Sequence, residues 1–318
     1  MNSRPSPRDC VALTGATGFV GGHLLRRLTA AGWQVRALTR RPAALEPGEA
    51  VTPVVGDLES EAALAELVTG ATAVVHCAGL VAARSAAEFQ QVNAEGTARL
   101  LRAATSSATP PRFLLISSLA AREPQLSAYA ASKRRAEEIL CDRMAGHAWQ
   151  VLRPPVVYGP GDRATLPLFR QCARGLVLRP AGEGRFSMLY VEDLADAVTA
   201  LLAQDAPAGR IMELDDGKAD GYGWEEVLAT AERQLGRRIR SLAVPRPFQR
   251  LAAALGSLGA AATGRPAMLS QGKVNEIAHS DWVCRNGLLG DCISWRAAVG
   301  LDEGFSNTAA WYKAAGWL

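Results

Sequence analysis

The segment TGATGFVG, residues 14–21, constrains the fold more than any other part of the sequence, because it joins an apolar run to a helical pattern. The run CVALTG (10–15) is typical of a buried strand, and HLLRRLTAAG (23–32) has helical spacing and ends in glycine. Three glycines in GxxGxxG spacing permit a sharp turn and leave the first N–H groups of the helix free to bind an anion. The segment therefore predicts a strand–turn–helix unit with a dinucleotide pyrophosphate site at the turn.

Strand-like and helical patterns then alternate along the first half of the chain. Apolar runs typical of strands lie at 33–40, 71–79, 112–118 and 149–159, and helical spacing lies at 62–70, 93–107 and 127–144. Alternation with short connections predicts a parallel sheet with helices on both faces. The expected fold class is therefore α/β, a doubly wound parallel sheet of the Rossmann type with a smaller, mostly helical C-terminal lobe.

The second half of the chain continues this pattern only in part. A strand and helix are expected at 186–204 and a strand at 210–216, and prolines interrupt much of the rest. We therefore expect a dinucleotide-binding domain over 1–160 that also includes sheet elements from 186–216. Residues 161–185 and 217–318 are expected to form the substrate-binding lobe.

Composition excludes several classes of protein. The net charge is +4 without a long run of Lys or Arg, so nucleic-acid binding is not expected. The six cysteines lack CxxC spacing and a nearby His cluster, which predicts reduced thiols and no metal site. The polar N-terminus does not resemble a signal peptide, and no apolar run approaches the ~20 residues of a membrane span. A cytoplasmic protein is expected.

The residues after the second strand indicate which dinucleotide binds. This segment reads ALTRRP (37–42), with Arg40 and Arg41 where an acidic residue would hold the ribose 2′-hydroxyl of NAD. A guanidinium can bind a 2′-phosphate in a bidentate way, so NADP(H) is favoured, while NAD(H) stays open. Asp57 and Leu58 follow the third strand and are expected to flank the adenine.

A second motif, YAASK, places Tyr129 one helical turn before Lys133. An ammonium fixed beside a phenol stabilises the phenolate and lowers a pKa that is about 10 when unperturbed. The pair is therefore a candidate proton-transfer device, although an exposed helix edge would also explain it.

The motifs TGATGFVG, GDL, HCAG, VNAEGT, ISSLAA, YAASK and LRPPVVYGPGD occur in this order. Together they resemble those of the extended short-chain dehydrogenase/reductases, over roughly residues 8–216. The resemblance implies that Tyr129 is the acid/base, that Lys133 tunes it and binds ribose, and that Ser118 orients the substrate carbonyl. Ser117 is the alternative serine, and Asn93 has either a structural or a catalytic role. The implied cofactor contacts are Gly15, Thr17, Gly18, Phe19, Val20, Gly21, Arg40, Arg41, Asp57, Leu58, Cys77, Ala78, Gly79, Tyr129, Lys133, Pro154 and Val156.

The segment RPPVVYG (153–159) bears on the substrate. Sugar-nucleotide members of the resembled family commonly carry Asn where this chain has Pro155, which offers no side-chain amide and no N–H. The form is closer to the 3β-hydroxysteroid dehydrogenase and dihydroflavonol reductase branch. The small, apolar stretch 247–269 could line a substrate tunnel, lie on a membrane, or simply pack within the lobe.

These observations favour an NADP(H)-dependent oxidoreductase that interconverts a ketone and a secondary alcohol on a bulky, lipid-like substrate, such as a 3-oxo-sphingoid, a ceramide-type ketone or a sterol. A nucleotide-sugar epimerase or dehydratase is one alternative. The other is a non-catalytic NAD(P)-binding assembly protein. The resemblance also implies homodimerisation through the helices at 93–107 and 127–144, and peripheral membrane contact is a further expectation.

Overall fold

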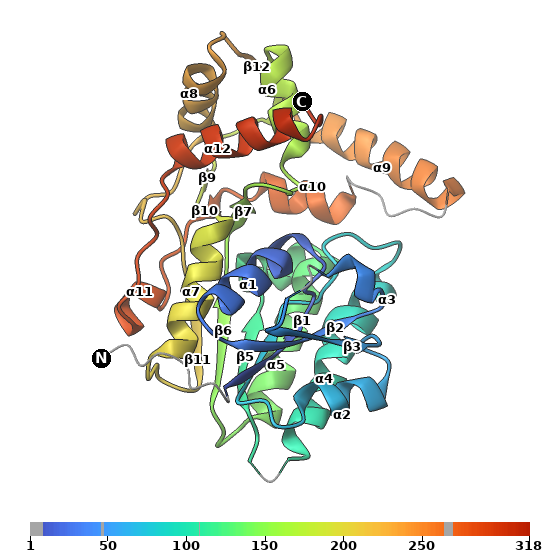
Figure 1. Cartoon of the computed structure of the whole chain (residues 1–318). Coiled ribbons are helices and arrows are strands. Elements are labelled where there is room, and N and C mark those ends of the chain that lie inside the picture. Colours follow the sequence, from blue (N-terminus) through green and yellow to red (C-terminus); the bar gives the residue numbers. More distant parts are fainter. Residues whose placement is uncertain (1–8, 46–47, 108, 264–269) are drawn as a thin grey trace.

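The computed structural model describes residues 9–45, 48–107, 109–263 and 270–318, and the side chains of these residues except 257–263. Its centre is a sheet of seven parallel strands in the order β3–β2–β1–β4–β5–β6–β11 (Figure 1). The strands are β1 (Cys10–Thr14), β2 (Gln34–Thr39), β3 (Val51–Val55), β4 (Ala73–His76), β5 (Arg112–Ile116), β6 (Trp149–Arg153) and β11 (Arg210–Glu213). The predicted doubly wound Rossmann sheet is confirmed.

Helices cover both faces of this sheet, because neighbouring residues of its strands point to opposite faces and both faces are apolar. Helices α1 (Phe19–Ala30) and α7 (Val191–Ala203) pack on one face, where Val11 and Leu13 point. On the other face Ala12 packs among residues of three further helices. These are α2 (Glu61–Val68), α4 (Gly96–Thr105) and α5 (Ala128–Arg143).

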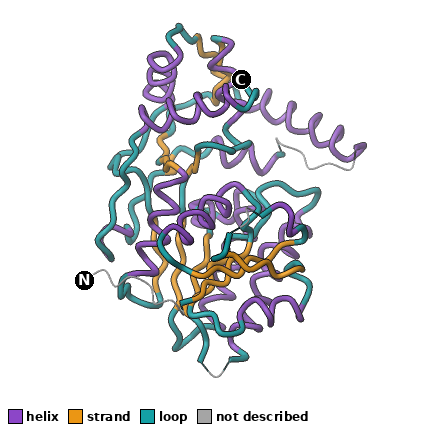
Figure 2. The backbone as a smooth tube through the Cα atoms, in the orientation of Figure 1, coloured by secondary structure: helices purple, strands orange, loops and turns teal. Residues whose placement is uncertain are grey.

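A second, smaller region lies beyond the carboxyl ends of the strands, and Figure 2 shows that helices and loops dominate it. Its core contains Phe169, Phe305 and Tyr312, with the two phenylalanine rings stacked 4.3 Å apart. The longer elements are α6 (Leu166–Arg174), β8 (Leu176–Pro180), α8 (Trp224–Leu235), β12 (Arg240–Val244), α9 (Arg246–Thr263), α10 (Gln271–Ala278) and α12 (Leu301–Ala314).

Short elements complete the structure. The short strands are β7 (Val156–Tyr158), β9 (Arg185–Phe186), β10 (Met188–Tyr190) and β13 (Asp281–Trp282), and the short helices are η1 (Pro42–Ala44), α3 (Ala86–Phe89), η2 (Gln90–Glu95), η3 (Leu119–Arg122), η4 (Pro124–Leu126) and α11 (Leu289–Cys292). Three parallel pairs form small separate sheets: β7 with β10, β8 with β12, and β9 with β13.

Two expectations about strands were wrong in detail. The run at 149–159 is two strands, β6 and β7, because Pro154 and Pro155 between them cannot donate to a β-ladder. The strand expected at the start of 186–204 does not join the main sheet. Its β10 portion pairs with β7, which has already left that sheet.

Candidate active site

The glycine-rich turn lies between β1 and α1. Gly15 has a φ of +77°, which favours glycine, and a Cβ there would lie 2.7 Å from the amide nitrogen of Ala78. A Cβ on Gly21 would lie 1.9 Å from the carbonyl oxygen of Gly15, so the helix packs on the turn without room for a side chain. Gly18 caps α1 without a side-chain hydrogen bond, and the first turn of α1 contains no acidic residue. The turn therefore fits the pyrophosphate of a dinucleotide.

Three other cofactor candidates in this loop have different surroundings. Thr17 is exposed at the turn, and Phe19 is partly buried with its ring edge-to-face against His23, 5.7 Å between centroids. Val20 packs against the core beneath α1. Thr17 is thus the accessible side chain of the three.

The adjacent strand β4 brings its own candidates to the same edge of the sheet. The Ala78 N–H donates to Thr14 Oγ1 at 3.1 Å, which ties the segment Cys77–Gly79 to the end of β1. A Cβ on Gly79 would lie 3.6 Å from Lys133 Nζ. The structure therefore brings HCAG, the glycine turn and YAASK together.

A buried polar chain beneath this edge was not predicted from the sequence. His76 is 1% exposed, and its Nδ1 and Nε2 lie 2.7 Å from Thr14 Oγ1 and 3.0 Å from Thr97 Oγ1. Burial, followed by the nearby charge of Lys133, lowers the pKa of His76 to about 3. A neutral imidazole therefore cross-links β1, β4 and α4 below the candidate cofactor site.

The candidates for cofactor selectivity lie at the ends of β2 and β3. Arg40 and Arg41 are exposed, and neither makes an ion pair within the described part of the chain. Thr39 Oγ1 accepts a hydrogen bond of 3.0 Å from the Arg41 N–H. Asp57 is exposed and accepts one of 2.9 Å from the Glu59 N–H, whereas Leu58 packs against α4. Both guanidinium groups are thus available to an anion beside the glycine turn.

The three catalytic candidates lie together between β5 and α5. Ser118 is the N-cap of η3, where its hydroxyl accepts from the Ala120 N–H at 3.2 Å, and it lies close enough to Tyr129 to lower the pKa of the phenol. Tyr129 lies in the first turn of α5, which is capped by Ser127. Lys133, 8% exposed, donates from Nζ to the Ile116 carbonyl oxygen at 2.9 Å. The structure thus brings Ser118 close to Tyr129, and Lys133 follows Tyr129 by one turn of α5.

The pKa of Tyr129 differs from the expectation. Burial raises it to about 12 against the lowering effect of the Ser118 hydrogen bond, and the charges of Glu276 and Cys77 raise it further. Burial also lowers the pKa of Lys133. Lys133 is not among the groups that shift the Tyr129 pKa, and its Nζ is held at the Ile116 carbonyl. Tyr129 is therefore protonated at neutral pH, the form that can donate a proton to a carbonyl oxygen.

The two serines of the ISS segment have different partners. The Ser117 hydroxyl donates to Glu137 Oε1 at 2.5 Å, and Arg153 donates to the two oxygens of Glu137 from Nε at 2.9 Å and Nη2 at 2.6 Å. Ser117 thus points into the packing between sheet and α5, and Ser118 is the serine beside Tyr129. The sequence signal for Glu137 was its place one turn after Lys133 on the same helix face.

Asn93 lies in η2, a π-helical segment, and is 2% exposed. Its Oδ1 accepts from the Leu80 N–H at 2.7 Å, and its Nδ2 donates to the Leu80 carbonyl at 3.1 Å and to Ser132 Oγ at 2.9 Å. The amide thus bridges the loop after β4 to α5.

Helix α10 covers the start of α5. A Cβ on Gly272 would lie 2.7 Å from that of Ser127, and Asn275 Nδ2 donates to the Leu126 carbonyl oxygen at 3.2 Å. Glu276 is 7% exposed and accepts a hydrogen bond from the Ser127 hydroxyl. It also forms an ion pair with Lys273, with 3.0 Å between Oε2 and Nζ. A buried carboxylate thus lies near Tyr129, and no local sequence pattern indicated it.

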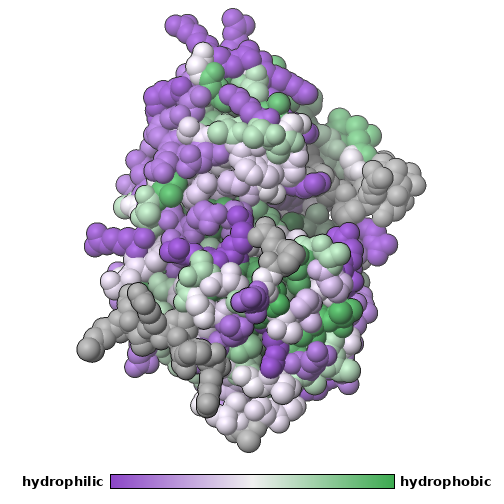
Figure 3. All heavy atoms as spheres, in the orientation of Figure 1, coloured by the Kyte–Doolittle hydropathy of each residue, from purple (hydrophilic) through white to green (hydrophobic). Residues whose placement is uncertain are grey.

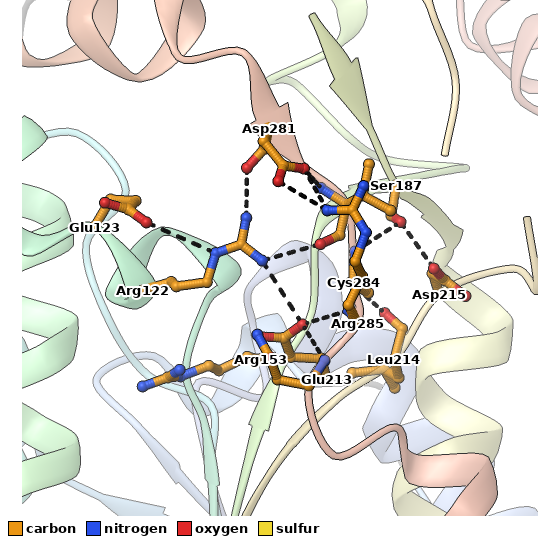
Figure 4. A network of polar contacts seen from close by, with 12 residues as sticks. Arg122, Glu123, Arg153, Ser187, Glu213, Leu214, Asp215, Asp281, Cys284 and Arg285 are labelled. Carbon is orange, nitrogen blue, oxygen red and sulfur yellow. Dashed lines mark hydrogen bonds and ion pairs between the residues drawn. The ribbon is translucent and has the colours of Figure 1, made fainter. Parts of the chain in front are cut away.

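A polar network fastens the loop after Ser118 to the segment around β13 (Figure 4). Arg122 donates to the carbonyl oxygens of Val283, at 2.9 Å, and Asp281. Glu213, 1% exposed at the end of β11, accepts from the N–H groups of Arg285 at 2.8 Å and Asn286 at 3.1 Å. This network holds the C-terminal segment that contains residues 281–286 against the carboxyl end of the sheet.

The last cofactor candidates follow β6. The Pro154 carbonyl oxygen accepts a hydrogen bond of 2.9 Å from the Leu119 N–H, and Val156 is 39% exposed on β7. Of the apolar stretch at 247–269, residues 264–269 lie outside the described residues. Among those described, no helix is both long and apolar enough to cross a membrane.

Comparisons with known proteins agree with this site. Residues 11–214 match the model of the NAD dependent epimerase/dehydratase family. The chain therefore belongs to this family, among the extended short-chain dehydrogenase/reductases, and is an NAD(P)-dependent enzyme of that class.

Individual relatives include reductases. The chain is 40% identical to a ceramide reductase of Caulobacter vibrioides, over 98% of this chain and 96% of the relative. It is 31% identical to a 4-hydroxy-2-methyl-3-oxo-4-farnesyl-3,4-dihydroquinoline-1-oxide ketoreductase of Stigmatella aurantiaca, over 64% of this chain and 67% of that protein. A solved structure of MoeE5 with UDP-glucuronic acid and NAD has the same fold, with a TM-score of 0.74, 21% identity, and coverage of 96% and 99% of the two chains.

Proposed function

We propose that this protein is an NADP(H)-dependent reductase that converts the ketone of a bulky 3-oxo lipid, of the N-acylated sphingoid class, to a secondary alcohol. The observation that carries the proposal is the site: Ser118, Tyr129 and Lys133 meet beside a glycine turn shaped for a dinucleotide. The near-complete coverage of a ceramide reductase at 40% identity supports the choice of substrate class.

The proposed chemistry uses the protonation states found in the site. The Ser118 and Tyr129 hydroxyls hold the carbonyl oxygen of the substrate, and Tyr129 donates its proton to that oxygen as the alcohol forms. NADPH, when bound, supplies the hydride to the carbonyl carbon. The buried Lys133 would hold the cofactor ribose, and its positive charge would help to stabilise negative charge that develops in the site.

The cofactor preference rests on the end of β2. Arg40 and Arg41 are exposed there without an acidic neighbour in an ion pair, so a 2′-phosphate can be bound by one or both guanidinium groups. Asp57, on the next strand, accepts a backbone N–H and is a weaker candidate for the adenine side. We therefore favour NADP(H) over NAD(H).

A nucleotide-sugar epimerase is the competing function, because a UDP-glucose 4-epimerase of Vibrio cholerae is 28% identical over 67% of this chain. Pro155 counts against it, since proline offers no amide to a diphosphate. The Tyr129–Lys133 pair counts against a purely structural NAD(P)-binding protein.

The test offers purified protein three substrates in parallel: an N-acyl-3-oxosphinganine in mixed micelles and a 3-oxosterol, each with NADPH, and UDP-glucose with NAD⁺. We expect stoichiometric NADPH oxidation with the first and a Tyr129→Phe variant that binds NADPH normally but loses at least a thousandfold in kcat. Conversion of UDP-glucose to its 4-epimer without accumulation of NADH, and no turnover of the lipid with NADPH, would overturn the proposal.

A further inference from the structure

The substrate lobe carries an unusual concentration of positive charge. Two segments, 165–182 and 236–275, contain ten of the 35 Lys and Arg residues and none of the 31 Asp and Glu residues. The other residues of the chain therefore have a net charge of −6, although the whole chain is +4. The molecule is strongly polarised, and the positive part belongs to β8, β12 and α9 with their neighbours.

The outward face of the β8–β12 pair is apolar. Leu178 and Leu242 are direct partners in this parallel pair and are 56% and 55% exposed, and Leu176 is 43% exposed on the same face. Val177 points the other way and is fully buried in the core around Phe169. One face of the β8–β12 pair thus packs on the lobe, while three leucines are exposed to solvent on the other face.

Helix α9 follows β12 directly and continues this apolar surface. Phe248, Leu251 and Leu255 recur at helical spacing and are 64%, 58% and 62% exposed, whereas Ala253 on the opposite side is fully buried. The helix projects from the body in Figure 1, and hydrophobic atoms gather over it in Figure 3.

The buried side of α9 is fastened to α10. Arg246 Nη2 donates to the Ala278 carbonyl oxygen at 3.2 Å, and Gln271 Nε2 donates to the Arg250 carbonyl oxygen at 2.8 Å. Because α10 carries Glu276 near Tyr129, these contacts connect α9 to the candidate active site.

Exposed arginines surround these apolar side chains. Arg240 lies opposite Leu176 on the outward face of the strand pair, and Arg246 and Arg250 lie in the first two turns of α9. The exposed arginines of segments 165–182 and 236–275 are Arg170, Arg174, Arg237, Arg238, Arg240, Arg246 and Arg250. None of them forms an ion pair within the described portion of the chain, so their charge is available to an external anion.

We propose that Leu176, Leu178, Leu242, Phe248, Leu251 and Leu255 with these arginines form a docking surface for the interface of an anionic phospholipid bilayer. Aliphatic side chains ringed by guanidinium groups match acyl chains below a layer of phosphate headgroups. A nucleic acid would leave the leucines without a partner, and a second copy of this chain would place these seven arginines against seven more. Docking would deliver a lipid substrate to the candidate active site, and this use rests on the proposed function.

The test is sedimentation of the full-length protein with sucrose-loaded vesicles of phosphatidylcholine containing 40 mol% phosphatidylglycerol. We expect binding at low salt, and at least tenfold weaker binding to phosphatidylcholine alone or in 0.5 M NaCl. The variant Phe248→Ser/Leu251→Ser/Leu255→Ser should bind at least tenfold more weakly. Removing two charges in Arg246→Gln/Arg250→Gln should weaken binding by about twenty-fivefold, at about fivefold for each charge.

Val55→Ser is the matched control, because Val55 is 64% exposed on the edge strand β3 of the main sheet and lies outside the proposed surface. It should bind vesicles like the wild type. Equal binding by the wild type and the triple variant would overturn the proposal. So would a wild-type dimer that the triple variant abolishes in analytical ultracentrifugation, or displacement from vesicles by duplex DNA with tight DNA binding.

A water-soluble, short-chain 3-oxo substrate separates this inference from the proposed function. The triple variant should reduce that substrate at the wild-type rate but reduce a vesicle-embedded lipid ketone at least tenfold more slowly. If the wild type reduces neither substrate yet binds anionic vesicles, the proposed function fails and the docking surface stands.

Discussion

The sharpest test of the structural account is Glu137→Gln, which neutralises a carboxylate at the centre of a buried network. Glu137 is 1% exposed and forms a bidentate ion pair with Arg153, whose side chain is 10% exposed. The Ser117 hydroxyl donates to the same carboxylate at 2.5 Å. The substitution preserves the shape of the side chain and removes the carboxylate that pairs directly with the buried Arg153 guanidinium.

The expected loss of stability follows from the burial of both partners. Removing one member of a buried ion pair destabilises a protein by about 3–5 kcal/mol, because the remaining charge is desolvated and unpaired. The entropy of unfolding is about 2.1 cal/mol/K per residue, so for 318 residues it is about 0.7 kcal/mol/K. The melting temperature should therefore fall by about 4–8 °C.

The same substitution should change the activity in a defined direction. Glu137 is one of the charges that raise the pKa of Lys133. Its removal lowers that pKa, so the ammonium form of Lys133 is lost at a lower pH and activity at high pH falls earlier than in the wild type. Differential scanning calorimetry measures the first effect, and the pH dependence of kcat measures the second.

Glu138→Gln is the control, because Glu138 is the next residue of α5, is 50% exposed, and pairs at the surface with Arg134 and Arg135. Surface pairs contribute about 0–1 kcal/mol, so its melting temperature should shift by less than about 2 °C. Equal shifts for the two variants, or an unchanged melting temperature for Glu137→Gln, would refute the buried network.

Three further predictions concern the site. Glu276→Gln should make kcat/KM for ketone reduction fall at a lower pH than in the wild type, because the Glu276 charge raises the pKa of Tyr129 and the reduction needs the protonated phenol. A fall of kcat/KM at the same or a higher pH would contradict this. Arg40→Glu/Arg41→Glu should reduce the preference for NADPH over NADH at least tenfold, and an unchanged ratio of kcat/KM values would exclude both arginines from 2′-phosphate binding. Gly21→Ala should weaken dinucleotide binding at least a hundredfold in calorimetric titration, because a Cβ there would lie 1.9 Å from the Gly15 carbonyl oxygen; wild-type affinity would show that the turn can move.

The parts of this structure that local sequence determines could be predicted. The glycine turn and the alternation of strand and helix depend on neighbouring residues, and they gave the correct sheet. Tyr129 and Lys133 could be paired because helical spacing alone places them on one face. The single strand expected at 149–159 is divided for an equally local reason, since Pro154 and Pro155 within that run cannot donate to a β-ladder.

Contacts between distant segments could not be predicted in this way. Glu276 is separated by 149 residues from Ser127, its partner beside Tyr129, and His76 by 62 residues from Thr14. The choice between Ser117 and Ser118 depends on Glu137, which lies on a different element. The raised pKa of Tyr129 follows mainly from its burial. That burial arises only when the fold is assembled, with α10 covering the start of α5.

The central claim is that Tyr129 protonates a lipid ketone that receives a hydride from NADPH. The most direct measurement is product analysis by mass spectrometry after reduction of an N-acyl-3-oxosphinganine with NADPH deuterated at the transferring position of C4. We predict an alcohol one mass unit heavier, labelled at the carbinol carbon, with the wild type and no such product with Tyr129→Phe. An unlabelled alcohol, or a labelled one formed equally well by the variant, would contradict the account.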